Sequence, residues 1–276
     1  MRTAAAFLRR DWLIWTSYRT AMVQQYLGLM LMIVVIYVLG SNFSGDLSPE
    51  TLLLQAPEGV EVPRQSGDYV AFALVGLALT DMFISGMSGI PKAIRNAQYS
   101  GTLETILLSP ISGGTFVLGS GMFAFLQSLV RAFVLLTFGF LVLGYWHDAN
   151  FWILPLVFIP GLLSFVALGL FSAAFILVLK QGDPISMVYA AISTVLGGTL
   201  FPTNALPGWL QPVVLLLPLS HALAGIRLAF AGASLEAVMP QIQILWAFTL
   251  ILLPSSLLFF RMAMRRGRKK GSLGYY

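Results

Sequence analysis

The amino-acid sequence predicts an all-α polytopic membrane protein with six transmembrane helices, and three observations support this class. Of its 276 residues, 58% are hydrophobic, only 10% are charged, and the mean hydropathy is +0.84. Ordinary soluble domains are about 45–50% apolar and about 25% charged. Since a membrane-spanning helix needs about 20 apolar residues, the chain has room for roughly six spans joined by short loops. This composition excludes a disordered chain, a coiled coil and a typical soluble enzyme.

The first 20 residues, 1–20, are expected to form an N-terminal interfacial helix rather than a span. Arg9, Arg10 and Asp11 interrupt the apolar run, and no small-residue cleavage site of a signal peptide follows them. Basic side chains are mixed with Trp12 and Trp15, which is typical of a helix lying at the level of the lipid headgroups. A plain anchoring segment is the alternative interpretation.

Six apolar stretches follow, and each is expected to cross the membrane within a single permease domain, residues 1–276. They cover about 21–40, 69–90, 114–144, 151–179, 185–200 and 242–260. The third is longer than a bilayer requires and must tilt or project beyond it. A further apolar stretch at 213–217 is too short to span and has a proline at each edge, so it predicts an outer re-entrant or interfacial hairpin between spans five and six. Residues 261–276 form a basic cytoplasmic tail.

The distribution of positive charge predicts that both termini lie in the cytoplasm. An even number of spans puts both ends on one side, and that side holds thirteen of the 16 lysines and arginines. Arg131 falls inside a span, and the opposite side holds only Arg64 and Arg227, so the positive-inside rule sets the orientation. The net charge of +5 is therefore interpreted as a signal for orientation, and no nucleic-acid partner is expected.

Motifs for catalysis and cofactor binding are missing from the sequence. The two histidines, His147 and His221, fall in different loops, and neither belongs to a metal-binding pattern such as H-E-x-x-H. A Gly-Lys dipeptide does not occur, so there is no P-loop for ATP, and no G-x-S-x-G sequence marks a serine nucleophile. We therefore expect no catalytic residue, no metal and no cofactor bound by this chain.

Two ionisable residues fall inside the predicted spans. Asp81 lies about twelve residues, or roughly 18 Å, into the second span, and Arg131 lies about fourteen residues, or roughly 21 Å, from the outer end of the third. Each charge costs about 2.5–3.5 kcal/mol on insertion scales, so each should face protein or water rather than lipid. Gln127 and Ser120 share the helical face of Arg131. Two interpretations stay open: a polar lining of a substrate path, or a structural Asp81–Arg131 pair between neighbouring helices.

The cytoplasmic loop at 91–110 contains a sequence that predicts a short amphipathic helix. Thr102 is a suitable N-cap for it. Its apolar face and its one carboxylate come from four residues: Leu103, Glu104, Ile106 and Leu107. Such a helix would present an apolar surface and one negative charge to a cytoplasmic partner. A plain interfacial loop is the alternative.

The segment between spans five and six holds the helix breakers and interface residues of the predicted hairpin. These are Pro202, Pro207, Trp209, Pro218 and His221. Trp209 is expected to anchor the hairpin at the membrane interface. Non-helical backbone at this depth must be buried in protein or line a cavity.

At these two segments the chain resembles the type-2 ABC transporter permeases. In the cytoplasmic loop the resemblance consists of Gly101-Thr102-Leu103-Glu104, followed by an apolar turn and Ser109-Pro110. In the outer segment it consists of Phe201-Pro202, then Leu206-Pro207-Gly208-Trp209-Leu210, then Pro218-Leu219-Ser220-His221 and Arg227. The plan of six spans with both ends inside covers essentially the whole chain and agrees with this family.

The resemblance implies the membrane subunit of an ATP-driven exporter in the bacterial inner membrane. Such subunits form homo- or heterodimers, and each docks through the coupling segment 101–108 on a separate cytoplasmic ATPase, which binds the ATP and magnesium. It also implies that spans two and five line the dimer interface and the path. The implied substrate is amphipathic, a drug, a lipid or a lipid-linked glycan, and membrane lipid is a further partner. A secondary transporter driven by an ion gradient is the alternative function.

Overall fold

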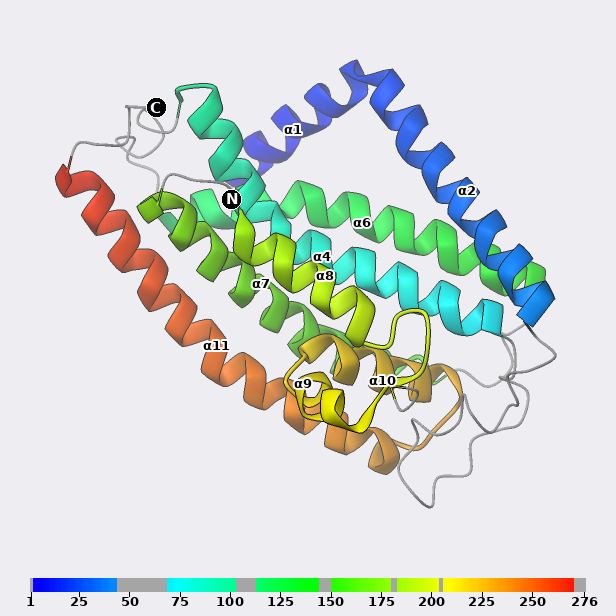
Figure 1. Ribbon diagram of the computed structural model, residues 1–276. Helices are drawn as coiled ribbons and strands as arrows, with labels where there is room; N and C mark the ends of the chain where they lie inside the picture. The colour runs from blue at the N-terminus through cyan, green and yellow to red at the C-terminus, as the bar shows by residue number, and fades with distance from the viewer. Residues whose placement is uncertain are drawn as a thin grey trace.

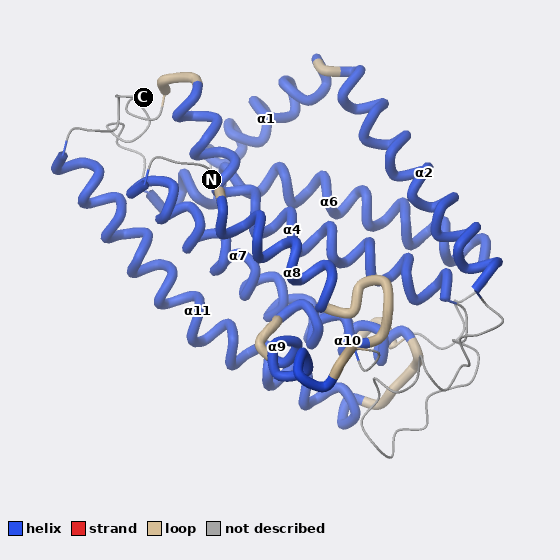
Figure 2. The backbone as a smooth tube through the Cα atoms, viewed as in Figure 1, coloured by secondary structure: helices blue, strands red, loops and turns tan. Residues whose placement is uncertain are grey.

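The computed structural model describes residues 2–43, 69–102, 113–143, 150–179, 183–203 and 206–270 (Figure 2). These ranges are almost entirely helical and contain no β-strand, which confirms the all-α prediction for the described residues. The main helices are α1 (Arg2–Ser17), α2 (Arg19–Phe43), α4 (Tyr69–Tyr99), α6 (Gly113–Leu143), α7 (Ile153–Leu179), α8 (Pro184–Leu196), α10 (Pro218–Phe230) and α11 (Leu235–Lys270). A 3₁₀ turn (Gly208–Leu210) and the short α9 (Gln211–Leu215) precede α10.

Four long helices, α4, α6, α7 and α11, form the body of the molecule (Figure 1). α7 packs against both α11 and α4, and α4 in turn packs against α6. α10 packs on α7 and α11, α1 lies on α6, and α2 diverges from the bundle except where it meets α4. The C-terminal ends of α4, α7 and α11 lie at the same end of the bundle as the start of α6. The two ends of the bundle are therefore built from different parts of the chain.

Three helices in the described residues are long and apolar enough to cross a membrane, and they coincide with three of the predicted spans. They are Phe72–Tyr99, Ile153–Leu179 and Leu235–Arg266. A fourth candidate is the pair Gly208–Leu215 and Pro218–Phe230, which is bent by 87° as a broken span or a re-entrant loop would be. Shorter apolar helices lie in α2, α6 and α8, at the other predicted spans. The count of six spans and the side of each terminus stay predictions.

Two helix boundaries differ from the sequence prediction. α4 continues through Pro91 to Tyr99, whereas the second span was predicted to stop at residue 90. Pro91 cannot donate to the carbonyl of Met87 one turn earlier, but the rest of the helix ladder is intact. α8 ends at Leu196 rather than at 200, because the glycines that follow it form a turn with Gly198 at φ +84°. At 13 residues α8 is about 20 Å long, short of the about 30 Å hydrocarbon core.

The carbonyl that Pro91 leaves free lies against α7 at Gly169. A Cβ placed on Gly169 would come well within 3.0 Å of the oxygen of Met87, so only glycine allows the two backbones to approach this closely. Met87 is fully buried at this crossing. The proline in α4 and the glycine in α7 therefore form one packing feature. Close backbone approach at small residues is the usual way in which helices associate in membranes.

Aromatic stacking and hydroxyl groups also hold the helices together. The rings of Phe83 in α4 and Phe165 in α7 stack with their centroids 5.1 Å apart. Ser164 in α7 and Thr249 in α11 lie with their hydroxyl oxygens 3.0 Å apart, and both donate to the carbonyl oxygen of Pro160, at 2.9 and 2.8 Å. The hydrogen bond from Thr249 joins α11 to α7, and interhelical hydrogen bonds of this kind contribute about 0.6 to 2 kcal/mol in membrane proteins.

Gly101 ends α4 and starts the segment that was predicted to contact a partner. Its φ of +67° is left-handed, which a glycine adopts without strain. The amide of Thr102 donates to the carbonyl of Ala97 at 2.9 Å, and the amide of Gly101 donates to that of Gln98 at 3.0 Å, which together form a Schellman cap. Thr102, predicted as an N-cap for the next helix, here belongs to the C-cap of α4. The other predicted coupling residues, Leu103, Glu104, Ile106 and Leu107, lie outside the described residues.

Candidate functional site

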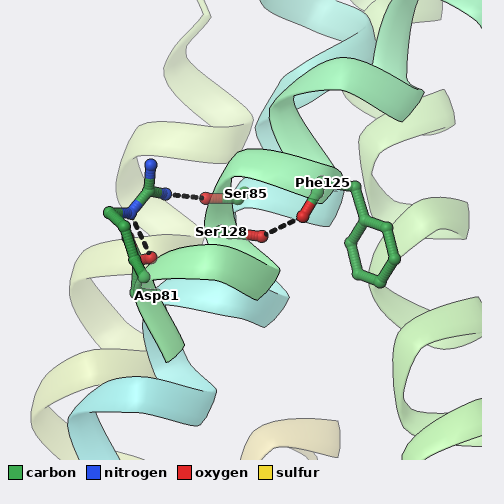
Figure 3. A network of polar contacts seen from close by, with 5 residues as sticks. Asp81, Ser85, Phe125 and Ser128 are labelled. Atoms are coloured by element: carbon green, nitrogen blue, oxygen red, sulfur yellow. Dashed lines mark hydrogen bonds and ion pairs between the residues drawn. The ribbon is translucent and has the colours of Figure 1, made fainter. Parts of the chain in front are cut away.

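The two charges predicted inside the membrane meet between α4 and α6. Arg131 donates from Nε to Oδ2 of Asp81 at 2.8 Å and from Nη2 to Oγ of Ser85 at 3.0 Å (Figure 3). Ser85 follows Asp81 by one turn of α4, so both acceptors lie on the same helical face. The arginine side chain is 12% exposed and the aspartate side chain 41% exposed. The structure thus shows the ion pair that was one of the two interpretations of these residues.

The remaining polar residues of this predicted site belong to α6. Gln127 lies one turn before Arg131 on the same stripe and is half-buried. Ser128, which was not predicted, is fully buried and donates to the carbonyl of Phe125 at 2.7 Å, so its hydrogen bond stays within α6 (Figure 3). The side chain of Ser120 lies outside the described part of α6. Ser85 was not predicted for this site, although its spacing of four residues from Asp81 could have identified it.

The ion pair offsets the cost of burying two charges only in part. Two of the three guanidinium nitrogens of Arg131 donate to Asp81 and Ser85, but a large fraction of Asp81 remains uncovered on the surface of the chain. An ionised carboxylate in contact with lipid would be strongly unfavourable. The face of α4 that carries Asp81 and Ser85 therefore needs either water or another protein surface beside it. This requirement is compatible with both interpretations, because a paired charge can also line a path.

The outer hairpin is built around a break between α9 and α10. Pro218 starts α10, and the chain bends sharply before it. Ser220 places its hydroxyl 2.8 Å from the carbonyl of Val214 and 2.7 Å from that of Leu217, and His221 places Nε2 3.0 Å from that of Leu215. These contacts satisfy carbonyl groups that a continuous helix would have satisfied itself. They give the Pro-Leu-Ser-His sequence a physical role at the break.

His221 also connects the hairpin to α11. Its Nδ1 lies 2.8 Å from the side-chain oxygen assigned in Gln241, and its ring lies against Phe248 with centroids 6.1 Å apart. The ring is buried, with both nitrogens engaged. Of the other predicted hairpin residues, Pro202 and Pro218 are buried whereas Pro207 and Trp209 are exposed. The exposed Trp209 is placed where it can contact a membrane interface.

Arg227 was expected on the outer side of the membrane, and the structure shows what its guanidinium contacts. It lies on α10 and donates to three carbonyl oxygens: Gly198 at 2.7 Å, Phe72 at 3.1 Å and Thr199 at 3.2 Å. Its guanidinium also lies over the ring of Phe72, 3.5 Å from the centroid. The broken end of α8 leaves carbonyls without helical donors, and Arg227 supplies them. This arginine joins α10 to the ends of α8 and α4, which no pattern within one segment could reveal.

Replacing Arg227 by lysine should destabilise the protein even though the charge is kept. A single ammonium group cannot reproduce a planar fork that reaches three carbonyls and stacks on a ring. Losing two such hydrogen bonds costs about 1.5–3 kcal/mol, so the melting temperature in detergent should fall by roughly 5 °C. Arg261→Lys, at an exposed position of α11, is the matched control and should not change it. An unchanged melting temperature for Arg227→Lys would show that the three hydrogen bonds of Arg227 do not stabilise the protein.

Asp183 is a second residue that was missed, although its sequence signal is clear. An Asp-Pro pair before an apolar run is typical of a helix N-cap with proline at the first turn. Asp183 accepts from the amide of Ser186 at 3.1 Å and from the hydroxyl of Ser172 in α7. It thereby fixes the start of α8 against α7. In the described part of the chain, no group of three histidine, aspartate or glutamate side chains is placed to hold a metal ion.

Apolar helices of membrane-spanning length and a hairpin bent by 87° are the features of a helical integral membrane protein. The sequence matches the ABC-2 type transporter family over residues 4–231 and belongs to that family. The chain is thus a membrane subunit of the ABC transporter type. It is similar to nodulation protein J of Rhizobium leguminosarum bv. viciae, with 29% identity over 221 residues, which cover 77% of this chain and 83% of the relative.

Proposed function

We propose that this chain is the membrane subunit of an ATP-driven exporter that moves an amphipathic substrate out of the cytoplasm or the inner leaflet. The observation that carries the proposal is the Asp81–Arg131 pair on an incompletely covered face of α4. A partly exposed carboxylate on a helix of membrane-spanning length requires protein or water beside it rather than hydrocarbon. A substrate path between two subunits would provide both.

A second copy of the chain, or a related subunit, would cover this face. α8 supports such a dimer because it contacts α4 and exposes one apolar helical face. That face consists of Met187, Val188, Ala191, Ile192 and Val195. Two subunits facing each other along α4 and α8 would enclose the ion pair in a route with mainly apolar walls. Such walls and one polar group suit an amphiphile, such as a drug, a lipid or a lipid-linked glycan.

The proposed orientation puts both termini in the cytoplasm, in a bacterial inner membrane, with six spans. The C-terminal parts of α4 and α11 lie at one end of the bundle (Figure 1). These parts, with α1, carry seven basic residues whose side chains the structure describes, whereas α6 and α10 carry one described arginine each. The seven are Arg9, Arg10, Lys92, Arg95, Arg261, Arg265 and Arg266. By the positive-inside rule that end faces the cytoplasm. An ATPase at this end would bind the ATP and magnesium.

The coupling segment, residues 101–108, would transmit the motion of that ATPase. Its place in the chain supports this role, because it follows directly on the capped end of the helix that carries Asp81. Leu103, Ile106 and Leu107 would supply the apolar contact and Glu104 the charge. A displacement of this segment would reach the proposed path through α4 alone.

Two substitutions in the coupling segment test the function. Glu104→Ala should leave the membrane protein folded, because exposed carboxylates contribute little to stability, while lowering substrate-stimulated ATP hydrolysis. Leu107→Asp should weaken assembly with the ATPase by roughly 2 kcal/mol or more, about thirtyfold in affinity, if the contact is desolvated. The measurement is ATPase activity of the co-purified complex in lipid, with the amount of bound ATPase recorded for each variant.

Glu236→Ala is the matched control, since Glu236 is an exposed carboxylate in the first turn of α11 at the other end of the bundle. It should assemble and hydrolyse ATP as the unaltered chain does. Full assembly and full stimulation in both coupling variants would refute the docking role of this segment. A failure to co-purify any ATPase with the unaltered chain would count against the exporter itself.

A further inference from the structure

An apolar groove of about 310 Å³ opens on the surface where α7 and α11 lie side by side near their C-terminal ends. Its floor consists of Ala174 and Ala263, which are 3% and 4% exposed. Its walls are Phe175, Val178 and Leu179 from α7, and Phe259, Met262 and Arg266 from α11. The groove exists because two alanines face each other while larger side chains stand outside them. Its volume falls in the range of small-molecule sites, about 300–1,000 Å³.

The chemistry of the groove changes along its length. Arg266 is the one charged residue among the described residues that line it. Arg266 follows Met262 by four positions and Phe259 by seven, so the three side chains share one face of α11. The cation lies toward the C-terminal end of the helix, and the apolar part lies toward its middle. The groove therefore has the polarity of an amphiphile whose anionic end is outermost.

We propose that this groove binds one anionic phospholipid, with its phosphate on Arg266 and an acyl chain along the apolar walls. A guanidinium can hold a phosphate through two parallel hydrogen bonds. The inner leaflet is rich in anionic lipid, and basic pockets between helix ends on that side bind such headgroups. The choice of leaflet rests on the orientation proposed above, which places this end of α11 in the cytoplasm.

The neighbouring surface indicates lipid rather than a protein partner. Only 22% of the most apolar part of α11 is buried, and Leu250, Ile251 and Leu258 are exposed along it. An uncharged surface of this kind is stable against hydrocarbon. By contrast, the face that needs protein or water carries Asp81 on α4, and α7 packs between α4 and α11. The groove and the proposed path therefore lie on different sides of the bundle.

The experiment measures binding of phosphatidylglycerol to the delipidated protein in neutral detergent by native mass spectrometry. The unaltered chain should hold one phosphatidylglycerol more tightly than phosphatidylcholine. Arg266→Gln should weaken that site about tenfold by removing a charged hydrogen-bond donor. Val178→Trp, at an exposed wall position, should weaken it as well by filling the groove without changing any charge. Glycerol phosphate, which lacks acyl chains, should not compete.

Arg265→Gln is the matched control, because Arg265 is the adjacent exposed arginine and does not line the groove. It should keep the tight site. An equal loss in Arg265→Gln and Arg266→Gln would mean that only general positive charge attracts the lipid, and it would overturn the proposal. Full binding by Val178→Trp, or competition by glycerol phosphate, would overturn it too. ATPase coupling is no part of this measurement, so its outcome is independent of the exporter function.

Discussion

Replacing Arg131 with glutamine should destabilise the protein. The change removes the guanidinium nitrogen that lies 2.8 Å from the carboxylate of Asp81, and Asp81 lies on a helix of membrane-spanning length. Breaking one half of a fully buried ion pair costs about 3–5 kcal/mol, because the remaining charge is uncompensated. The Asp81 side chain is 41% exposed, so the loss here should be smaller, about 1–3 kcal/mol. The folded fraction recovered from membranes and the melting temperature in detergent should both fall. Arg261→Gln, which removes an exposed arginine from α11, should change neither.

A second substitution shows whether the loss comes from the pair. Asp81→Asn removes the stranded charge, so adding it to Arg131→Gln should restore part of the stability. The coupling energy of this double-mutant cycle should be about 1–3 kcal/mol, and strictly additive effects would show that the two residues act separately. If the double variant folds but its ATPase is no longer stimulated by substrate, the pair also serves the path. If it transports normally, the pair is structural alone.

Gly169→Ala should destabilise the protein, although the same change stabilises most helices. The new methyl group would press on the carbonyl of Met87 in α4, and a backbone atom cannot move aside as a flexible side chain can. Overpacking of this kind costs about 1–3 kcal/mol, so the melting temperature should fall by roughly 2–10 °C.

Gly28→Ala in α2 is the matched control, because nothing lies within 4 Å of the position of its new methyl group. Its free energy of unfolding should rise by about 0.5–1 kcal/mol, because alanine lowers the conformational entropy of the unfolded chain. The two alanine variants should therefore shift the melting temperature in opposite directions. A shift of the same sign in both would show that the Met87–Gly169 crossing is looser than described.

The positions of the long helices could be predicted from the sequence because apolar length is a local property. The stretch 151–179 differs from α7 by only two residues at its start. The end of α4 could not be predicted in this way, because a proline such as Pro91 usually marks the end of a helix. Here the helix continues, and the carbonyl of Met87 that Pro91 leaves free packs against Gly169 of α7. The contact between Gly169 and Met87 depends on tertiary packing, which a hydropathy pattern does not contain.

The same distinction applies to the candidate site. The depth of Asp81 and Arg131 in adjacent spans predicted that they could pair, and depth follows from counting residues. The partners of Arg227 could not be predicted, because the three carbonyls that surround it lie at broken helix ends from other parts of the chain. A rule that counts charges cannot detect unsatisfied backbone acceptors. Those acceptors exist only after α8, α4 and α10 have been brought together.

The crossing of Met87 and Gly169 divides α4 into two unequal arms. From Met87 the helix runs about 18 Å to Tyr99 at the coupling end and about 9 Å back to Asp81. A rigid helix that tilts about this contact moves its two arms in opposite directions, and the ion pair moves about half as far as the coupling end. A pull on the segment after Gly101 would thus push Asp81 the other way, with reduced travel and increased force. In the proposed transport cycle this contact would act as the fulcrum of a lever, with a ratio set by the position of one glycine.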